Sequence, residues 1–181
     1  MVLKPSLDTR DGKGIIRSRA GLSRPCLTID KDVDLYKAIK SYSNALAAQF
    51  ESLRWVIIDE CQFLTEEQVD QLSDVVDFLD INVMCYGLRT DFKSRLFPAS
   101  KRLFELADDI EEVKSTCECG KNKTSINARF DKNGDIIVDG DQIMVGGDES
   151  YRAICRKCWK DKVRDKINKE MERKGRNEAT D

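Results

Sequence analysis

The chain has 181 residues, of which 40% are hydrophobic and 35% are charged, a balance that suits one compact domain with a small appendage. Its 31 basic and 33 acidic residues give a net charge of −2, so no basic field points to nucleic acid as a partner. No apolar run reaches the roughly 20 residues that cross a bilayer, and no signal peptide is recognisable, so we expect a cytoplasmic protein without a membrane partner.

The first 50 residues predict a strand end, a turn-rich segment and a helix. Val2 and Leu3 resemble the end of a strand, which the chain leaves at Pro5, and residues 15–32 alternate in polarity and contain turn signals. Asp32 is placed to cap a helix that runs to about Phe50. The apolar stripe of this helix has helical spacing and consists of Leu35, Ile39, Tyr42, Leu46 and Phe50.

A short apolar run, Trp55–Ile58, is followed at once by Asp59 and Glu60. This pattern predicts a buried parallel strand that places both carboxylates at its carboxyl end, the edge at which open α/β sheets bind ligands. There, a first acid can hold Mg²⁺ on nucleotide phosphates and a second can orient or deprotonate a nucleophile. The alternative is a strand followed by the acidic first turn of the next helix. Histidine is absent, so acid–base chemistry falls most naturally to carboxylates.

The next segment continues the strand–helix alternation. Thr65 predicts an N-cap, with Gln68 completing a capping box, and the helix that follows presents apolar residues at helical spacing. Residues 81–88 predict another buried strand, after which residues 89–92 form a loop at the same edge as Asp59. A short helix around Leu103 comes next. This order of elements favours a parallel sheet with helical crossovers.

Seven cysteines are many for a chain of this size. Cys61 and Cys85 lie in or beside apolar runs and are most simply core residues. Two close pairs have the spacing of a structural, four-thiolate Zn²⁺ site and consist of Cys117, Cys119, Cys155 and Cys158. Gly120 permits the sharp turn that the first pair requires. The alternatives are two disulfides, which a reducing cytosol disfavours, or free thiols.

The remaining residues predict a smaller second lobe. Residues 123–145 alternate and contain turns, which indicates β-ribbons, and the Gly146-Gly147 loop leads towards the second cysteine pair. From Trp159 onward the chain is strongly charged and predicts a helix that frays into a solvated tail. We therefore divide the chain into an α/β domain (1–114), a zinc-binding lobe (115–160) and a charged C-terminal helix or tail (161–181).

These motifs resemble those of the cytosolic, zinc-containing (type II) thymidine kinases, particularly the bacterial members. The resemblance covers the chain to about residue 160 and rests on five segments in the family's order: residues 4–12, 18–22, 59–63, 86–92 and 147–158. It implies a P-loop-type α/β fold with a zinc-stapled β-ribbon lobe, and ATP-dependent phosphorylation of the 5′-hydroxyl of thymidine. A homotetramer is also implied.

The resemblance further implies site residues. Glu60 would be the catalytic base. The residues that would bind ATP and its Mg²⁺ are Asp8, Thr9, Arg10, Asp59, Glu60, Cys61 and Gln62. The residues that would bind thymidine, largely through backbone groups, are Phe92, Gln142, Ile143, Met144, Val145, Gly146 and Tyr151. The alternatives are a solvated loop residue for Arg10 and core aromatics for Phe92 and Tyr151.

The sequence departs from the family in one respect. The family begins with a strand and a Gly-x-x-x-x-Gly-Lys-Ser/Thr phosphate loop, and Gly12-Lys13-Gly14 is too short to replace it. We therefore expect a fragment that lacks about 25 to 30 N-terminal residues, is inactive or weakly active, and exposes apolar sheet surface and an unpaired sheet edge. The alternative is a non-catalytic remnant that binds nucleoside or pairs with full-length subunits. A zinc-ribbon module for nucleic acid is disfavoured by the balanced charge.

Overall fold

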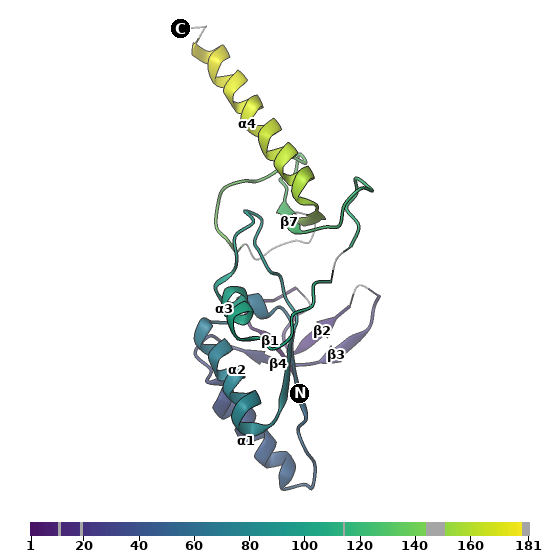
Figure 1. Cartoon of the computed structure of the whole chain (residues 1–181), viewed down its shortest axis with the longest axis vertical. Helices are drawn as coiled ribbons and strands as arrows, with labels where there is room; N and C mark the ends of the chain where they lie inside the picture. The colour runs from purple at the N-terminus through teal and green to yellow at the C-terminus, as the bar shows by residue number, and fades with distance from the viewer. Residues whose placement is uncertain (11, 19, 114, 144–150, 179–181) are drawn as a thin grey trace. The chain divides into compact units, whose positions relative to one another are not determined.

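The computed structural model describes residues 1–10, 12–18, 20–113, 115–143 and 151–178. It divides into two compact units (Figure 1). Each unit has its own apolar core. The first unit comprises Met1–Arg89 and Leu96–Ile110, and the second comprises Thr90–Arg95 and Glu111–Asp181.

A four-stranded parallel sheet forms the centre of the first unit. In spatial order its strands are β4 (Leu27–Ile29), β1 (Val2–Pro5), β5 (Trp55–Ile58) and β6 (Asn82–Cys85). A separate antiparallel hairpin of β2 (Ile15–Arg17) and β3 (Ser23–Pro25) lies between β1 and β4 in the sequence. The predicted parallel sheet is confirmed, and β4 joins it although its three residues are too few to give a periodic signal.

The helices of the first unit are α1 (Leu35–Ala47), α2 (Glu66–Leu79) and α3 (Pro98–Leu106), with a short 3₁₀ helix, η1 (Cys61–Phe63), after β5. The predicted capping box of α2 is confirmed. The Thr65 hydroxyl accepts the backbone N–H of Gln68, and the side-chain oxygen of Gln68 accepts the backbone N–H of Thr65. The predicted cap of α1 is wrong. Asp34, not Asp32, accepts the N–H of Lys37 at 2.9 Å and begins the helix.

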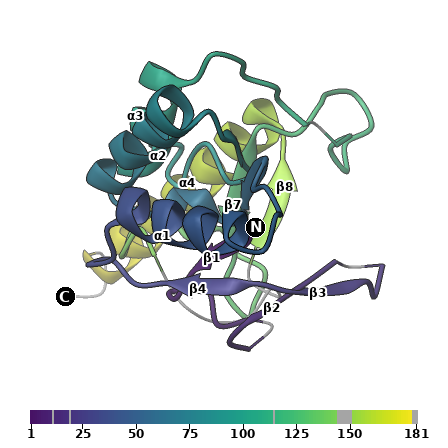
Figure 2. The ribbon, with the colours of Figure 1, turned by 90° about the horizontal axis from the view of Figure 1, so that it is seen from below.

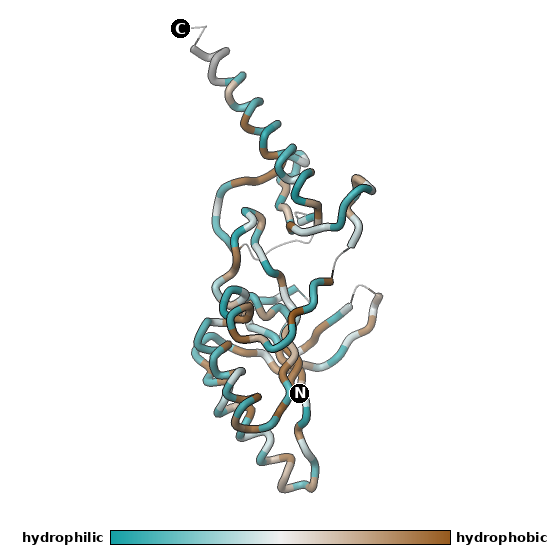
Figure 3. The backbone as a smooth tube through the Cα atoms, in the orientation of Figure 1, coloured by the Kyte–Doolittle hydropathy of each residue, from teal (hydrophilic) through white to brown (hydrophobic). Residues whose placement is uncertain are grey.

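The three helices pack on one face of the sheet (Figure 2). Alternate strand residues, including Leu3, Val56 and Ile58, meet the apolar stripes of the helices in a buried core. Figure 3 shows the hydrophobic segments gathered along these strands. Some apolar side chains on β5 and β6 remain outside this core: Trp55 is 47% exposed and Met84 39% exposed.

The second unit is built on an antiparallel pair, β7 (Ile126–Arg129) and β8 (Tyr151–Ile154), followed by α4 (Arg156–Glu178). Residues 123–145, predicted to form β-ribbons, contain β7, but the strand that pairs with it, β8, lies outside this range and was not predicted. The charged C-terminal segment is helical as far as Glu178. Trp159 and Val163 of α4 pack against a core that includes Ile126, Phe130 and Ile154, whereas most other α4 residues are polar. Within the described residues, every helix is too short or too polar to cross a membrane.

Candidate active site and metal centre

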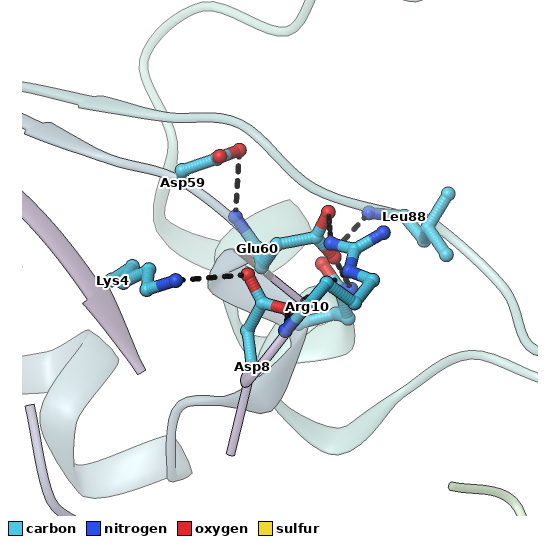
Figure 4. A network of polar contacts seen from close by, with 7 residues as sticks. Lys4, Asp8, Arg10, Asp59, Glu60 and Leu88 are labelled. Carbon is cyan, nitrogen blue, oxygen red and sulfur yellow. Dashed lines mark hydrogen bonds and ion pairs between the residues drawn. The ribbon is translucent and has the colours of Figure 1, made fainter. Parts of the chain in front are cut away.

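Polar residues of the first unit gather where its parallel strands end (Figure 4). Asp8 and Arg10 come from the loop after β1, Asp59 and Glu60 directly follow β5, and Leu88 follows β6. Because the carboxyl ends of parallel strands meet at one edge, residues far apart in the sequence become neighbours there. The edge predicted to carry the chemistry therefore carries a connected polar network.

Glu60 lies at the centre of this network. Its Oε1 atom accepts a hydrogen bond from Nη2 of Arg10, and its Oε2 atom accepts one from Nε2 of Gln62 at 2.6 Å. The backbone of Glu60 is left-handed, with φ of 52°, a conformation that costs a non-glycine residue about 1–3 kcal/mol. Its N–H donates to Oδ1 of Asp59 at 3.0 Å. These contacts hold the Glu60 carboxylate in one orientation.

Asp8 and Arg10 form the second half of the network. The Asp8 carboxylate, whose side chain is 5% exposed, accepts from Nε of Arg10 at 2.8 Å and from the Arg10 backbone N–H at 3.3 Å. Burial alone would raise the pKa of Asp8, but the hydrogen bonds and charge of Arg10 outweigh burial and lower this pKa. Asp8 and Glu60 together raise the pKa of Arg10 against the effect of its burial. Asp8 and Arg10 are therefore both charged at neutral pH.

Gln62 links the network to the loop after β6. Its side chain is buried, and its Oε1 atom accepts the backbone N–H of Leu88 at 3.0 Å while its amide nitrogen binds Glu60. Gly87 makes this close approach possible: a Cβ atom there would lie 2.6 Å from both Cys61 Sγ and Gln62 Oε1. Any larger residue at position 87 would displace the group that orients Glu60.

The structure brings together most of the residues predicted to bind ATP and its metal. Asp8, Arg10, Glu60 and Gln62 form direct contacts, and Asp59 lies beside them through the Glu60 amide. Arg10 is thus ion-paired. Thr9 is exposed, whereas Cys61 is buried in the core.

Cys61 behaves as a core thiol. Its pKa is raised, first by a hydrogen bond with the Cys85 side chain and then by burial. This agrees with the prediction that both cysteines are small core residues. The sequence analysis did not identify Gly87 or Lys4 as site residues. The sequence did contain a sign of the second, because a lysine is unusual within an apolar strand.

In the second unit, Phe92 is buried and stacked. The guanidinium carbon of Arg129 lies 3.9 Å from the centroid of the Phe92 ring, a cation–π arrangement, and the Phe92 carbonyl accepts from Nε1 of Trp159 at 3.0 Å. Arg129, itself buried, donates to the carbonyl oxygens of Asp139 and Asp141, at 3.3 Å each. Arg129 therefore ties the Phe92 ring to the segment that leads towards Gln142.

The other predicted thymidine-binding residues have different surroundings. Nε2 of Gln142 donates to Oδ2 of Asp91 at 3.0 Å, next to Phe92 in the chain. Ile143 is half-buried, and Tyr151 pairs with Arg129 in the β7–β8 register. Met144, Val145 and Gly146 lie outside the described residues. Asp91 and Arg129 were not singled out from the sequence, because their partners are distant along the chain.

The four cysteines of the predicted zinc site converge in the second unit. The sulfur atoms of Cys117, Cys119, Cys155 and Cys158 all lie within 4.8 Å of one another, and all are free of disulfides. Zn–S bonds of about 2.3 Å in a tetrahedron would separate the sulfurs by about 3.8 Å. The arrangement therefore fits a tetrahedral ion with small adjustments, and all four positions would be filled by protein.

Local backbone geometry prepares the sulfurs for a metal. Gly120 adopts φ of 69°, and its N–H donates to the Cys117 carbonyl at 2.8 Å, which closes the predicted turn. Backbone N–H groups, foremost that of Lys121, lower the pKa of Cys119 to about 6. The pKa of Cys158 is instead raised to about 12, first by its hydrogen bond with Cys155, so protons are shared unequally among the sulfurs. A divalent cation would allow all four to be thiolates.

Comparison with known proteins gives a consistent result. The family model described as "Thymidine kinase" matches residues 1–159. A thymidine kinase from Mannheimia succiniciproducens is 44% identical over 163 residues, covering 90% of this chain and 80% of the relative. A thymidine kinase from Aliivibrio fischeri is 44% identical, covering 88% of this chain and 80% of the relative. A thymidine kinase from Yersinia pseudotuberculosis is 40% identical, covering 91% of this chain and 81% of the relative.

Proposed function

Because the chain belongs to the thymidine kinase family, we propose that it transfers the γ-phosphoryl group of ATP to the 5′-hydroxyl of thymidine. The observation that carries this proposal is the placement of Glu60. Its carboxylate stands at the carboxyl edge of the sheet and is oriented by Arg10 on one oxygen and by Gln62 on the other. Phosphoryl transfer requires mainly positioning, charge neutralisation and a proton acceptor, and these residues provide such groups.

In the proposed reaction, the 5′-oxygen of thymidine forms a bond to the γ-phosphorus while the bond from that phosphorus to the bridging oxygen of ADP breaks. The hydroxyl proton passes to the Glu60 carboxylate, which retains lone pairs beside its two hydrogen bonds. The cation of Arg10 offsets charge that develops on the transferred group. Asp59 is assigned to the Mg²⁺ that accompanies ATP, because its Oδ1 atom accepts the Glu60 amide and, among the described residues, its other oxygen makes no hydrogen bond.

We assign nucleoside recognition to the second unit. Phe92, Gln142, Ile143 and Tyr151 belong to it, as do Met144, Val145 and Gly146 by sequence. The Arg129–Phe92 stack and the Gln142–Asp91 hydrogen bond support a fixed arrangement of the described members of this set. Zn²⁺ held by the four cysteines would be structural, because no ligand position would remain for a substrate. We further propose a cytoplasmic homotetramer, as in the resemblance noted from the sequence.

The experiment is a direct assay of Mg²⁺-ATP-dependent phosphorylation of thymidine, with product identified as thymidine monophosphate. The 181 residues contain no Gly-x-x-x-x-Gly-Lys-Ser/Thr loop. The assay is therefore run on this chain and on a version with a phosphate-loop unit placed before Met1. Product from either protein supports the proposal, and activity confined to the extended version would assign phosphate binding to that loop.

The alternative is a non-catalytic protein that binds nucleoside or pairs with longer subunits. If neither protein forms thymidine monophosphate while zinc is bound and the fold is intact, the result would support this alternative and contradict the kinase proposal. Measuring equilibrium binding of thymidine to the inactive protein would then distinguish nucleoside binding from subunit pairing.

A further inference from the structure

Lys4 occupies an unusual position for a lysine. It lies on β1 between Leu3 and Pro5, and none of its surface is exposed. Because Leu3 points into the core beneath the helices, the alternation of the strand directs Lys4 to the opposite face of the sheet. A buried ammonium group is costly unless it is paired, so a lysine here requires a reason beyond packing.

The ammonium group of Lys4 points to one acidic partner. Its Nζ atom lies 3.6 Å from Oδ2 of Asp8, and Figure 4 shows the two groups facing each other. Within the described part of the chain, Nζ has no hydrogen-bond partner. Lys4, Asp8 and Asp59 also all act electrostatically on the buried Cys26 thiol, which places the three charges in one neighbourhood. The position of Lys4 is thus determined by charge and not by a completed hydrogen-bond set.

Asp8 lies between Lys4 and Arg10 and contacts both. Its Oδ2 atom faces Lys4, while its Oδ1 atom accepts from both the side chain and the backbone of Arg10. Arg10 in turn binds Glu60 through Nη2. Lys4, Asp8, Arg10 and Glu60 therefore form a row of alternating charges that begins inside the sheet and ends at the proposed base.

We infer that Lys4 is a positioning residue: its buried ammonium fixes the Asp8 carboxylate, which holds the Arg10 guanidinium on Glu60. Without Lys4, the nearly buried Asp8 carboxylate would rotate towards solvent, and Nε of Arg10 would lose its fixed acceptor. The inference rests on the proposed function, since it assigns Lys4 a role in preparing the site for phosphoryl transfer.

The test follows Arg10 itself by NMR. In the full chain labelled with ¹⁵N, the Nε–H signal of Arg10 is assigned by its disappearance in Arg10→Lys. Lys4→Met keeps the aliphatic volume and removes the charge, so we expect the Arg10 Nε–H signal to be lost through rapid exchange while core amide signals remain. Lys4→Arg, which keeps the charge, should retain it. Thr28→Val, an exposed neighbour on β4 in register with Lys4, is the matched control and should also retain the signal.

A folded Lys4→Met protein with an unchanged Arg10 signal would overturn the inference. If Lys4→Met does not fold, the neutral but polar Lys4→Gln carries the same test, and unfolding of both would show that Lys4 serves the fold alone. Where the protein phosphorylates thymidine, Lys4→Met should also lower kcat by about 100-fold with little change in the KM for thymidine, as expected for a misplacement of about 1 Å. Failure of the kinase assay in both the parent chain and the version with the added phosphate loop would reject the proposed function and leave the NMR result to decide the role of Lys4.

Discussion

Arg10 and Glu60 lie 50 residues apart in the chain and form an ion pair at the carboxyl edge of the first unit's sheet. Each partner has a second anchor: Asp8 holds Nε of Arg10, and Gln62 holds the other oxygen of Glu60. A carboxylate and a guanidinium with two anchors each are oriented before any substrate arrives. Preorganised charge of this kind is what phosphoryl transfer requires from a protein.

The Asp8–Arg10 pair should make stability depend on pH. Because the pKa of Asp8 is lowered in the folded chain, its contribution is present above 3.8, its usual value, and is lost as the pH falls through the lower folded value. Asp8→Asn should therefore reduce the free energy of unfolding by about 1.5–3 kcal/mol near neutral pH. Urea denaturation across the acid range would show this difference shrinking below pH 3.8.

Asp77→Asn is the matched control for this experiment, because Asp77 is an exposed carboxylate of α2 in the same unit. It should leave the urea midpoint nearly unchanged at all pH values. A constant difference between Asp8→Asn and the parent chain, from neutral to strongly acid solution, would contradict the linkage.

Gly87 should tolerate no side chain. In Gly87→Ala, the new Cβ atom would meet Cys61 Sγ and Gln62 Oε1 at 2.6 Å, and overpacking of this kind costs about 1–3 kcal/mol. Thermal and urea unfolding would measure the loss of stability. The hydrogen bond from the Leu88 amide to Gln62 should open, and faster exchange of the Leu88 amide would report this. Tyr86→Phe, at an exposed neighbouring ring, should change stability by less than about 0.5 kcal/mol.

The cysteine cluster predicts about one zinc ion per chain. Cys119→Ser should abolish tight zinc binding, because the sulfur of Cys119 is one of the four that converge. Trp159, which packs on the second unit's core, should then change its fluorescence as that core loosens. Acid should release zinc from the parent chain, because thiolate ligands must be deprotonated. Cys26→Ser, in the first unit, should keep its zinc; equal zinc contents in the two variants would reject the assignment.

Much of the first unit could be predicted from local signals. The capping box at Thr65 and Gln68 involves residues three apart, and the run from Val56 to Ile58 ends at two acids, so a short window contains each signal. The cysteine pairs were equally informative, since metal-ligand spacing is a local property of each knuckle. The sequence could not decide between Asp32 and Asp34 as the N-cap of α1. Both are acceptable cap residues, and the backbone geometry determines which one caps the helix.

The network around Glu60 could be predicted only in part. The two acids after β5 could be recognised in the sequence. The ion pair between Glu60 and Arg10, however, depends on the pairing of β1 with β5, which no local pattern encodes. The burial of Lys4 depends on the same pairing. Arg129 was missed for a similar reason: it stacks on Phe92 from a strand that lies far along the chain. Long-range charge pairs therefore required the fold.

The most direct test of the central claim is the rate of thymidine phosphorylation by Glu60→Gln. Glutamine keeps the size of the side chain and can still accept the Arg10 hydrogen bond, but it cannot accept a proton. We predict that kcat falls by about 100- to 10,000-fold, with little change in the KM for thymidine. Glu66→Gln, an exposed residue in the first turn of α2, should leave kcat unchanged. A Glu60→Gln protein with the kcat of the parent would contradict the assignment of Glu60 as the base.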